Sequence, residues 1–359
     1  MRYRVVMVLA PALCVALSGE ALGSQSLGGD PHPTFTVGTA TARRGAKATG
    51  IIAVPAGSDA GTNIPVAVVH GAKPGPVLAL VAGVHGTEYA SIIALERLIG
   101  LLDPTPLSGT VIIVPLVNVA SFQQMVTHIN PIDRKSMSRY PGDMNGTQSD
   151  RAAYLIARQV VEQCDHLIDM HGGDLDESLR PISYWTVTGN EKQDAISRDM
   201  VLAFGGDTIV INNAPKDPTR LMSIGNMAST HGKPTIVVEA GYAGTVETDD
   251  VNALINGSMS VMRYLKMLPG QPAAIEHPVW IEKMLTIAST DTGIFYPLVK
   301  RGTYVARDEK IGYVTDYVGT MLFEARAPDA GEVLFIRSVP TANKGDSLAL
   351  IGVVRNEMK

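Results

Sequence analysis

Four residues of this sequence combine side chains that can bind a metal ion with side chains that can activate water. They are His85, Glu88, His171 and Glu239. Neutral imidazole and carboxylate groups are common zinc ligands, and a carboxylate that is not a ligand can accept a proton from water. A His and a Glu three positions apart are a frequent coincidence when taken alone, so the inference depends on the context of all four residues.

Each of the four residues follows an apolar run that predicts a buried strand. The runs are residues 77–84, 166–170 and 235–238. In open α/β sheets, sites form at the carboxyl ends of the parallel strands. A satisfied core histidine or a hydrogen bond between strands would explain any one of these residues. Four polar groups at the same edge are costly unless they pair or coordinate, so together they predict a metal site.

Catalytic zinc sites use three protein ligands and leave one position open. We therefore assign His85, Glu88 and His171 as the ligands of one zinc ion per chain. Glu239 is then free to take a proton from a water molecule and pass it to a leaving amine. Asp169, two residues before His171, either orients a ligand ring or caps a nearby turn.

The elements that must position these residues alternate between strands and helices. Apolar residues at helical spacing from Ile92 to Leu102, and the segments 152–163 and 250–268, predict helices. Further strands are predicted at residues 34–37, 64–69, 111–117 and 209–211. This alternation predicts an α/β domain over residues 24–275, with a mostly parallel or mixed central sheet between helices.

Beyond residue 275 the sequence is rich in strand and turn signals and almost without helix signals. Residues 293–311 resemble residues 331–348, which predicts a small pseudo-symmetric β-sandwich domain over residues 276–359. The layout is similar to the biotinyl and lipoyl carrier folds. Those carriers present a lysine between the two halves, and residues 312–328 contain none, so we expect a structural or substrate-gating role.

The N-terminal residues have the pattern of an export signal. Arg2 and Arg4 precede an apolar run, and small residues stand near Gly23. We predict a signal peptide over residues 1–23, export to the periplasm or the medium, and no stable membrane insertion after cleavage. Removing it leaves Cys164 as a lone thiol, which is expected to be a small buried residue.

The bulk composition excludes some partners. The 359 residues are 45% hydrophobic and 18% charged, with a formal net charge of −5 and no basic run. Binding to nucleic acid needs clustered lysine and arginine, so no nucleic-acid partner is expected. A small-molecule amide is the expected substrate, and a homo-oligomer is a possible state of the protein.

At the residues named above, the sequence resembles the succinylglutamate desuccinylase and aspartoacylase family, in particular its bacterial predicted-deacylase branch. This family belongs to the carboxypeptidase A-like zinc hydrolases. The resemblance rests on residues 83–88, 169–173 and 238–241 and spans about residues 30–355. It implies a zinc-carboxypeptidase-like fold, zinc as the metal and hydrolysis of an N-acyl amide. It also implies ligand roles for His85, Glu88 and His171, and the general-base role for Glu239.

The sequence departs from the family where substrate is bound. Family members often carry an Asn-Arg pair ahead of an aromatic-Pro-Gly element, but here Ser138 replaces the asparagine. Arg139 can stand for the family arginine, and we predict that it grips a substrate carboxylate or stabilises the oxyanion. Tyr242 is a second candidate for substrate binding. Weaker candidates are Arg151, Arg180 and Arg220.

These observations predict a zinc-dependent deacylase that cleaves the amide bond of a small N-acylated amino acid. A metallopeptidase acting on short or cell-wall peptides is an alternative that uses the same chemistry. A protein that has kept the metal but lost catalytic power is an alternative from another class.

Overall fold

The computed structural model describes residues 32–217 and 220–355. The described residues from Thr34 onward form one compact unit. The predicted signal peptide lies outside the described residues and stays a prediction. Among the residues that are described, no helix is both long enough and apolar enough to cross a membrane.

The first part of the chain alternates strands and helices. Its elements are β1 (Thr34–Val37), β2 (Ala40–Arg43), β3 (Ala46–Val54), β4 (Thr62–His70), β5 (Lys73–Ala82), α1 (Tyr89–Leu101), β6 (Ser108–Val114), α2 (Val119–Gln124), α3 (Gln148–Ile156), the π-helix η1 (Ala157–Val161), β7 (His166–His171), β8 (Glu177–Val187), α4 (Glu191–Phe204), β9 (Thr208–Asn213), α5 (Ile224–Thr230), β10 (Thr235–Tyr242) and α6 (Thr248–Tyr264).

The rest of the described chain contains strands alone. They are β11 (Val279–Ala288), β12 (Gly293–Pro297), β13 (Tyr304–Val305), β14 (Lys310–Thr315), β15 (Met321–Arg326), β16 (Gly331–Arg337), β17 (Thr341–Ala342) and β18 (Ser347–Val354). The predicted domain boundary after residue 275 lies in the connection between α6 and β11.

A twelve-stranded mixed sheet forms the framework, in the order β13-β16-β18-β11-β9-β8-β10-β7-β5-β6-β4-β3. Its central strands β6, β5, β7 and β10 are parallel neighbours. β8 runs antiparallel to β10, and β4 antiparallel to β6. The expected α/β fold with a mixed central sheet is confirmed.

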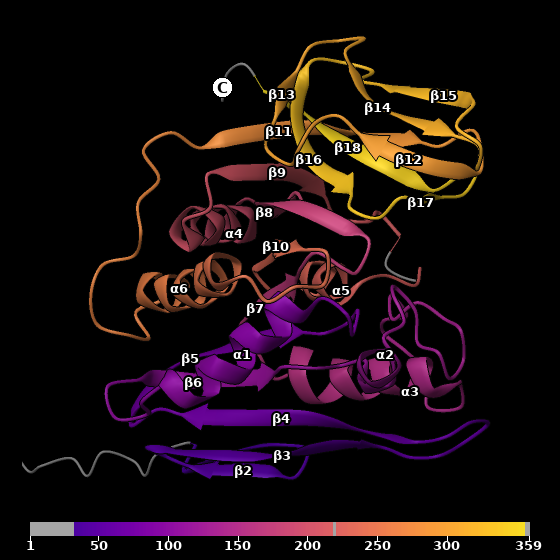
Figure 1. Ribbon diagram of the computed structural model, residues 1–359. Coiled ribbons are helices and arrows are strands. Elements are labelled where there is room, and N and C mark those ends of the chain that lie inside the picture. Colours follow the sequence, from indigo (N-terminus) through magenta and orange to yellow (C-terminus); the bar gives the residue numbers. More distant parts are fainter. Residues whose placement is uncertain (1–31, 218–219, 356–359) are drawn as a thin grey trace, which may run out of the picture. The chain divides into compact units, whose positions relative to one another are not determined.

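The central strands are apolar along their length because helices cover both faces of the sheet (Figure 1). Residues of α1, α4 and α6 share one buried core with these strands. Residues of α3, η1 and α5, together with β1 and β2, share a second core on the opposite side. The sheet is therefore held rigidly from both sides.

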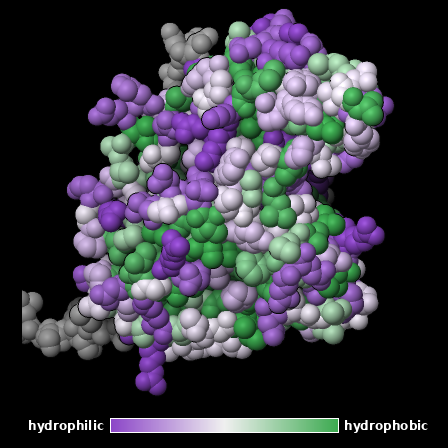
Figure 2. Space-filling view, viewed as in Figure 1, coloured by the Kyte–Doolittle hydropathy of each residue, from purple (hydrophilic) through white to green (hydrophobic). Residues whose placement is uncertain are grey.

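The C-terminal strands form the expected β-sandwich, but one of its layers belongs to the main sheet. β11, β13, β16 and β18 continue the twelve-stranded sheet, and β16 also pairs with β8. β12, β14, β15 and β17 make a separate four-stranded sheet. An apolar core that includes Phe295, Ile311 and Leu348 fills the space between the layers. In the space-filling view the outline is indented on the right, below the C-terminal strands (Figure 2).

The main element missing from the sequence-based expectation is β8. Its segment contains Arg180 and Pro181 and shows no regular alternation, so it gave no strand signal. Because proline cannot donate to a sheet ladder, Pro181 sits where the register with β10 shifts, between Ile182 and Leu179. The helix α4 was also missed, although Asn190 caps its start and Gly205 ends it.

Arg151 has a structural role that its sequence position did not reveal. Its side chain is 2% exposed and pairs with Asp59 at 2.7 Å. It also donates to the carbonyl oxygens of Pro55 and Gly146. Arg151 therefore ties the segment after β3 to the start of α3 and does not line a cavity that could bind substrate.

Arg151→Ala is expected to lower the free energy of unfolding by about 2–4 kcal/mol, since it leaves carbonyl groups and Asp59 without their partner. The measurement is urea-induced unfolding followed by circular dichroism. Arg158→Ala removes an exposed pair with Glu162 and should leave the unfolding midpoint nearly unchanged. Equal effects of the two substitutions would contradict the structural role of Arg151.

Candidate metal centre

The turn after β5 directs His85 and Glu88 to the edge of the sheet. Gly83 begins this turn with a φ of 65°, and a side chain there would lie 2.8 Å from Leu116 Cδ1. Only glycine fits such a position without strain. The backbone N–H of Gly86 donates to Ser121 Oγ at 2.9 Å, so α2 fixes the turn. The sequence thus holds both side chains rigidly.

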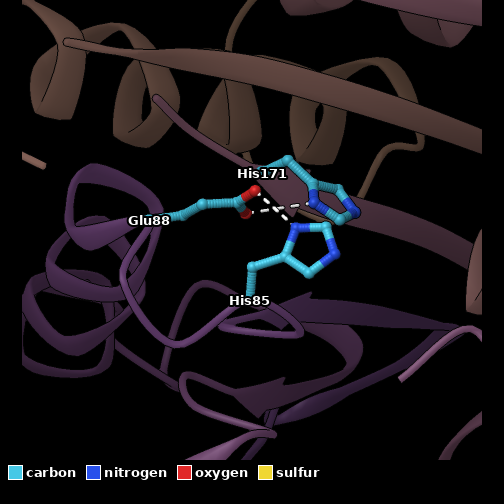
Figure 3. A group of neighbouring side chains, drawn as sticks. All are labelled: His85, Glu88 and His171. Carbon is cyan, nitrogen blue, oxygen red and sulfur yellow. Dashed lines mark hydrogen bonds and ion pairs between the residues drawn. The ribbon is translucent and has the colours of Figure 1, made fainter. Parts of the chain in front are cut away.

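His85, Glu88 and His171 converge on one point (Figure 3). Glu88 Oε1 lies 2.7 Å from His85 Nδ1, and Glu88 Oε2 lies 3.0 Å from His171 Nδ1. One possible ligand atom from each residue lies within 4.8 Å of the others. Two imidazoles and one carboxylate at this spacing form a donor set suited to a divalent metal ion.

Asp169 holds the far side of the His171 ring. Its Oδ1 lies 3.2 Å from His171 Nε2, and its Oδ2 accepts the backbone N–H of Gly225 at 3.3 Å. Asp169 can therefore orient the imidazole while it anchors the start of α5. A carboxylate behind a histidine ligand fixes the ring and raises its basicity.

Glu239 lies beside this cluster because β10 pairs with β7 in parallel. The register places Glu239 directly opposite His171. Glu239 lies within β10, which continues to Tyr242, whereas the sequence pattern ended this strand at residue 238. Burial raises the pKa of Glu239 to about 7, although the His171 imidazole lowers it. Burial, and then the nearby Glu239 carboxylate, raise the pKa of Tyr184 on β8 well above its ordinary value.

A cavity of about 310 Å³ opens over these four residues. Its other ionisable lining residues are His128, Glu177 and Tyr184. The C-terminal strands supply one wall, with Thr286, Phe335, Ser347, Ala349 and Leu350. No arginine or lysine is among the described residues that line the cavity.

The carboxylates of the cavity outnumber its cations. Burial and then the nearby Glu88 carboxylate raise the pKa of Glu177 to about 8. Glu88 is also buried, which raises its pKa, but His171 and His85 more than offset this and hold it at about 2. Burial lowers the pKa of His171, yet Glu88 and Asp169 outweigh it and raise this pKa well above its ordinary value. The raised pKa values of Glu177 and His171 mean that both groups keep their protons to a higher pH than usual. The cavity therefore favours added positive charge.

His128 borders the cluster from the long segment between α2 and α3. Its ring lies edge-on to His85, with 5.7 Å between the ring centroids. Asp176 and Asp174 each lie 3.4 Å from a ring nitrogen, and these carboxylates, Asp176 first, raise the pKa of His128 to about 9. Glu177 and His128 were not singled out from the sequence. The acidic run that follows Gly172-Gly173 was the available signal for Glu177.

The two predicted substrate-binding residues do not line this cavity. Arg139 donates from Nε to Asp150, which also binds Lys135. Tyr242 is 43% exposed, and the Arg301 guanidinium lies 5.7 Å from its ring centroid. The roles proposed for Arg139 and Tyr242 stay predictions. Arg180 pairs with Glu332 and Asp207.

Cys164 and Arg220 take no part in the cluster. Cys164 is a small buried residue, as expected, and burial raises the pKa of its thiol to about 12. Arg220 is exposed.

The mixed α/β sheet therefore gathers at its strand ends two imidazoles and a carboxylate that could hold a metal ion. The model of the succinylglutamate desuccinylase/aspartoacylase catalytic domain matches residues 74–265, which include all four residues of the cluster. The chain belongs to this family, as its sequence motifs indicated. Its members are deacylases, so the chain is assigned to amide hydrolases that act on N-acyl amino acids.

Relatives with known names support this placement. The chain is 26% identical over 298 residues to N-alpha-acetyl-L-2,4-diaminobutyric acid deacetylase of Halomonas elongata. The matched region covers 81% of this chain and 86% of the relative. The product-bound ectoine utilization protein EutE (DoeB) of Ruegeria pomeroyi matches with a TM-score of 0.79 and 23% identity, over 90% of this chain and all of the other. A succinylglutamate desuccinylase/aspartoacylase of Rhodobacter sphaeroides matches with a TM-score of 0.77 and 23% identity, over 87% and 96% of the two chains. These two solved structures have the same fold as this chain.

The cluster predicts that the purified protein binds about one divalent metal ion per chain. His85→Ala and Glu88→Ala should each lower metal occupancy by more than tenfold, because each removes one of three ligands. Metal content after dialysis is the measurement. His277→Asn, at an exposed histidine outside the cluster, should keep full occupancy. Full occupancy in the His85 and Glu88 variants would show that the metal lies elsewhere.

Proposed function

We propose that the protein is a zinc-dependent deacylase that hydrolyses the amide bond of a small N-acylated amino acid. His85, Glu88 and His171 would hold the metal, and Glu239 would act as the general base. The observation that carries the proposal is the convergence of one carboxylate and two imidazoles beside a fourth, buried carboxylate in one cavity.

The residues present fit a zinc ion. Two histidine nitrogens and one carboxylate oxygen are a known catalytic zinc donor set, and it leaves room for water. The pKa values of Glu177 and Glu239 stay raised although imidazole groups lie nearby, so a further cation would be favourable in this cavity. When bound, zinc supplies Lewis acidity, which lowers the pKa of water and polarises the carbonyl group of the amide.

Side chains of the protein then carry out the proton transfers of the reaction. Glu239 takes a proton from the attacking water, whose oxygen bonds to the amide carbon. When the C–N bond breaks, Glu239 gives this proton to the leaving nitrogen, so the products are a carboxylic acid and a free amine. Tyr184 lines the same cavity, and its raised pKa keeps the hydroxyl protonated, so it can donate to the Glu239 carboxylate. Asp169 keeps the His171 ring in orientation.

The wall formed by β11, β16 and β18 supports a small substrate. Phe335 and Leu350 of this wall line the cavity, whose volume of about 310 Å³ suits a small molecule. A long peptide would need an open groove on both sides of the scissile bond. The metallopeptidase alternative is therefore restricted to short peptides, and N-acyl amino acids fit the cavity better.

The charge of the cavity supports a substrate that carries an amino group. Glu177 is directed into the cavity, while no lysine or arginine among the described residues lines it. A substrate ammonium would satisfy Glu177, whereas a second substrate carboxylate would meet the same negative charge. The deacetylase relative acts, by its name, on an acetylated diamino acid. We propose the same substrate class here, and that the protein acts outside the cytoplasm.

Glu239→Gln is expected to lower kcat by about 10²–10⁴-fold and to retain the metal, because the amide cannot accept the proton of water. Hydrolysis of N-acetyl-2,4-diaminobutyrate and metal content are measured on the same samples. In the wild type, kcat/KM should fall as the pH drops below about 7, where Glu239 becomes protonated. Loss of metal from Glu239→Gln would assign Glu239 as a ligand instead.

Glu177→Gln tests the substrate charge. A charge-assisted hydrogen bond to an ammonium contributes about 1.5–3 kcal/mol, so kcat/KM for N-acetyl-2,4-diaminobutyrate should fall by about 10-fold to 100-fold. For N-acetyl-alanine, which lacks the second amine, the same substitution should change kcat/KM little. An equal loss for both substrates would mean that Glu177 serves the reaction and not the selection of substrate.

A further inference from the structure

A second cavity, of about 400 Å³, lies outside the candidate metal centre. Its polar lining residues are Ser178, Tyr242, Lys300, Arg301, Arg337 and Ser338. Tyr242, which the sequence suggested as a substrate-binding residue, lines this second cavity. The size is within the range of small-molecule sites, which is about 300–1,000 Å³.

Residues of the β8–β16 pair line both cavities. Leu179 pairs with Phe335, and both residues line the catalytic cavity. The neighbouring pair, Ser178 and Ile336, lines the second cavity. In the next pair, Glu177 lines the catalytic cavity and Arg337 the second one, so this strand pair forms the border between the two sites.

The second cavity has the opposite charge to the first. Three of its lining residues are cations, and none of the described lining residues is acidic. Arg337 is already balanced by Asp176 at 2.9 Å and Asp346 at 3.0 Å. Lys300 takes part in none of the ion pairs found among the described residues. Arg301 pairs with Asp250, so Lys300 supplies the charge that no acidic side chain among the described residues balances.

Arg301 is held in place before any ligand arrives. Its Nη1 donates to the carbonyl oxygens of Leu179 and Gly241 at 2.6 and 2.7 Å. These carbonyl groups, together with an ion pair with Asp250 at 3.5 Å, fix the guanidinium. A fixed guanidinium loses little conformational entropy when it binds an anion.

We propose that this cavity is a binding site for a small molecule that bears a carboxylate or phosphate group. Arg301 supplies the fixed positive charge, and the exposed Lys300 closes onto the anion. The hydroxyl groups of Ser178, Ser338 and Tyr242 offer further donors. The site is independent of the proposed reaction, because none of its lining residues belongs to the metal centre.

The test is calorimetric titration of the whole protein with inorganic phosphate, and separately with acetate, at constant ionic strength. We expect saturable binding of at least one anion, and the comparison distinguishes a phosphate ligand from a carboxylate ligand. Lys300→Gln should weaken this binding by about tenfold or more, since it removes a charge-assisted contact. Lys300→Arg should restore most of it.

Two further variants separate this site from other sources of binding. Lys344→Gln removes the same charge from a residue that lines neither cavity, and should bind the anion as the wild type does. His85→Ala should also retain binding, because phosphate attached to a metal ion would be lost in that variant. Absence of saturable binding, or equal binding by Lys300→Gln and the wild type, would overturn the proposal. So would loss of binding in His85→Ala.

Discussion

The parallel pairing of β5, β7 and β10 is the constraint on which the rest of the structure depends. Three adjacent parallel strands end at the same edge, so the residues that follow or finish them must meet. The register sets Glu239 directly opposite His171. The glycines around these strand ends let the chain turn without filling the space above them. Packing on both faces of the sheet then holds these side chains, which are far apart in the sequence, in fixed positions next to one another.

Electrostatics follows from that convergence. Glu88, Glu177 and Glu239 share a partly dehydrated space with few positive groups, which is costly until a cation enters. A metal ion relieves part of this cost, and a cationic substrate would relieve more of it. The second cavity reverses this balance, because three of its lining residues are cations and none of its described lining residues is acidic. The β8–β16 pair thus borders two cavities that favour ligands of opposite charge.

Much of this arrangement could be predicted from the sequence, for physical reasons. Buried parallel strands are apolar throughout, so β5, β7 and β10 and the polar residues at their ends were visible as a pattern. Glu177 was missed because β8 is antiparallel to β10 and brings its amino end to the edge. His128 comes from a segment without periodicity, and its position depends on contacts with Asp174 and Asp176. The ion pair of Arg139 with Asp150 also depends on tertiary contact.

The division of the catalytic cavity between early and late parts of the chain has a consequence for biosynthesis. The metal-binding cluster and Glu239 are all synthesised before residue 240, whereas the opposing wall begins with Thr286. Until β11 emerges from the ribosome, β9 is an uncovered edge strand that could pair with other chains. A nascent chain that has folded through β10 can therefore already capture a cation, but it acquires the shape that selects a substrate only later.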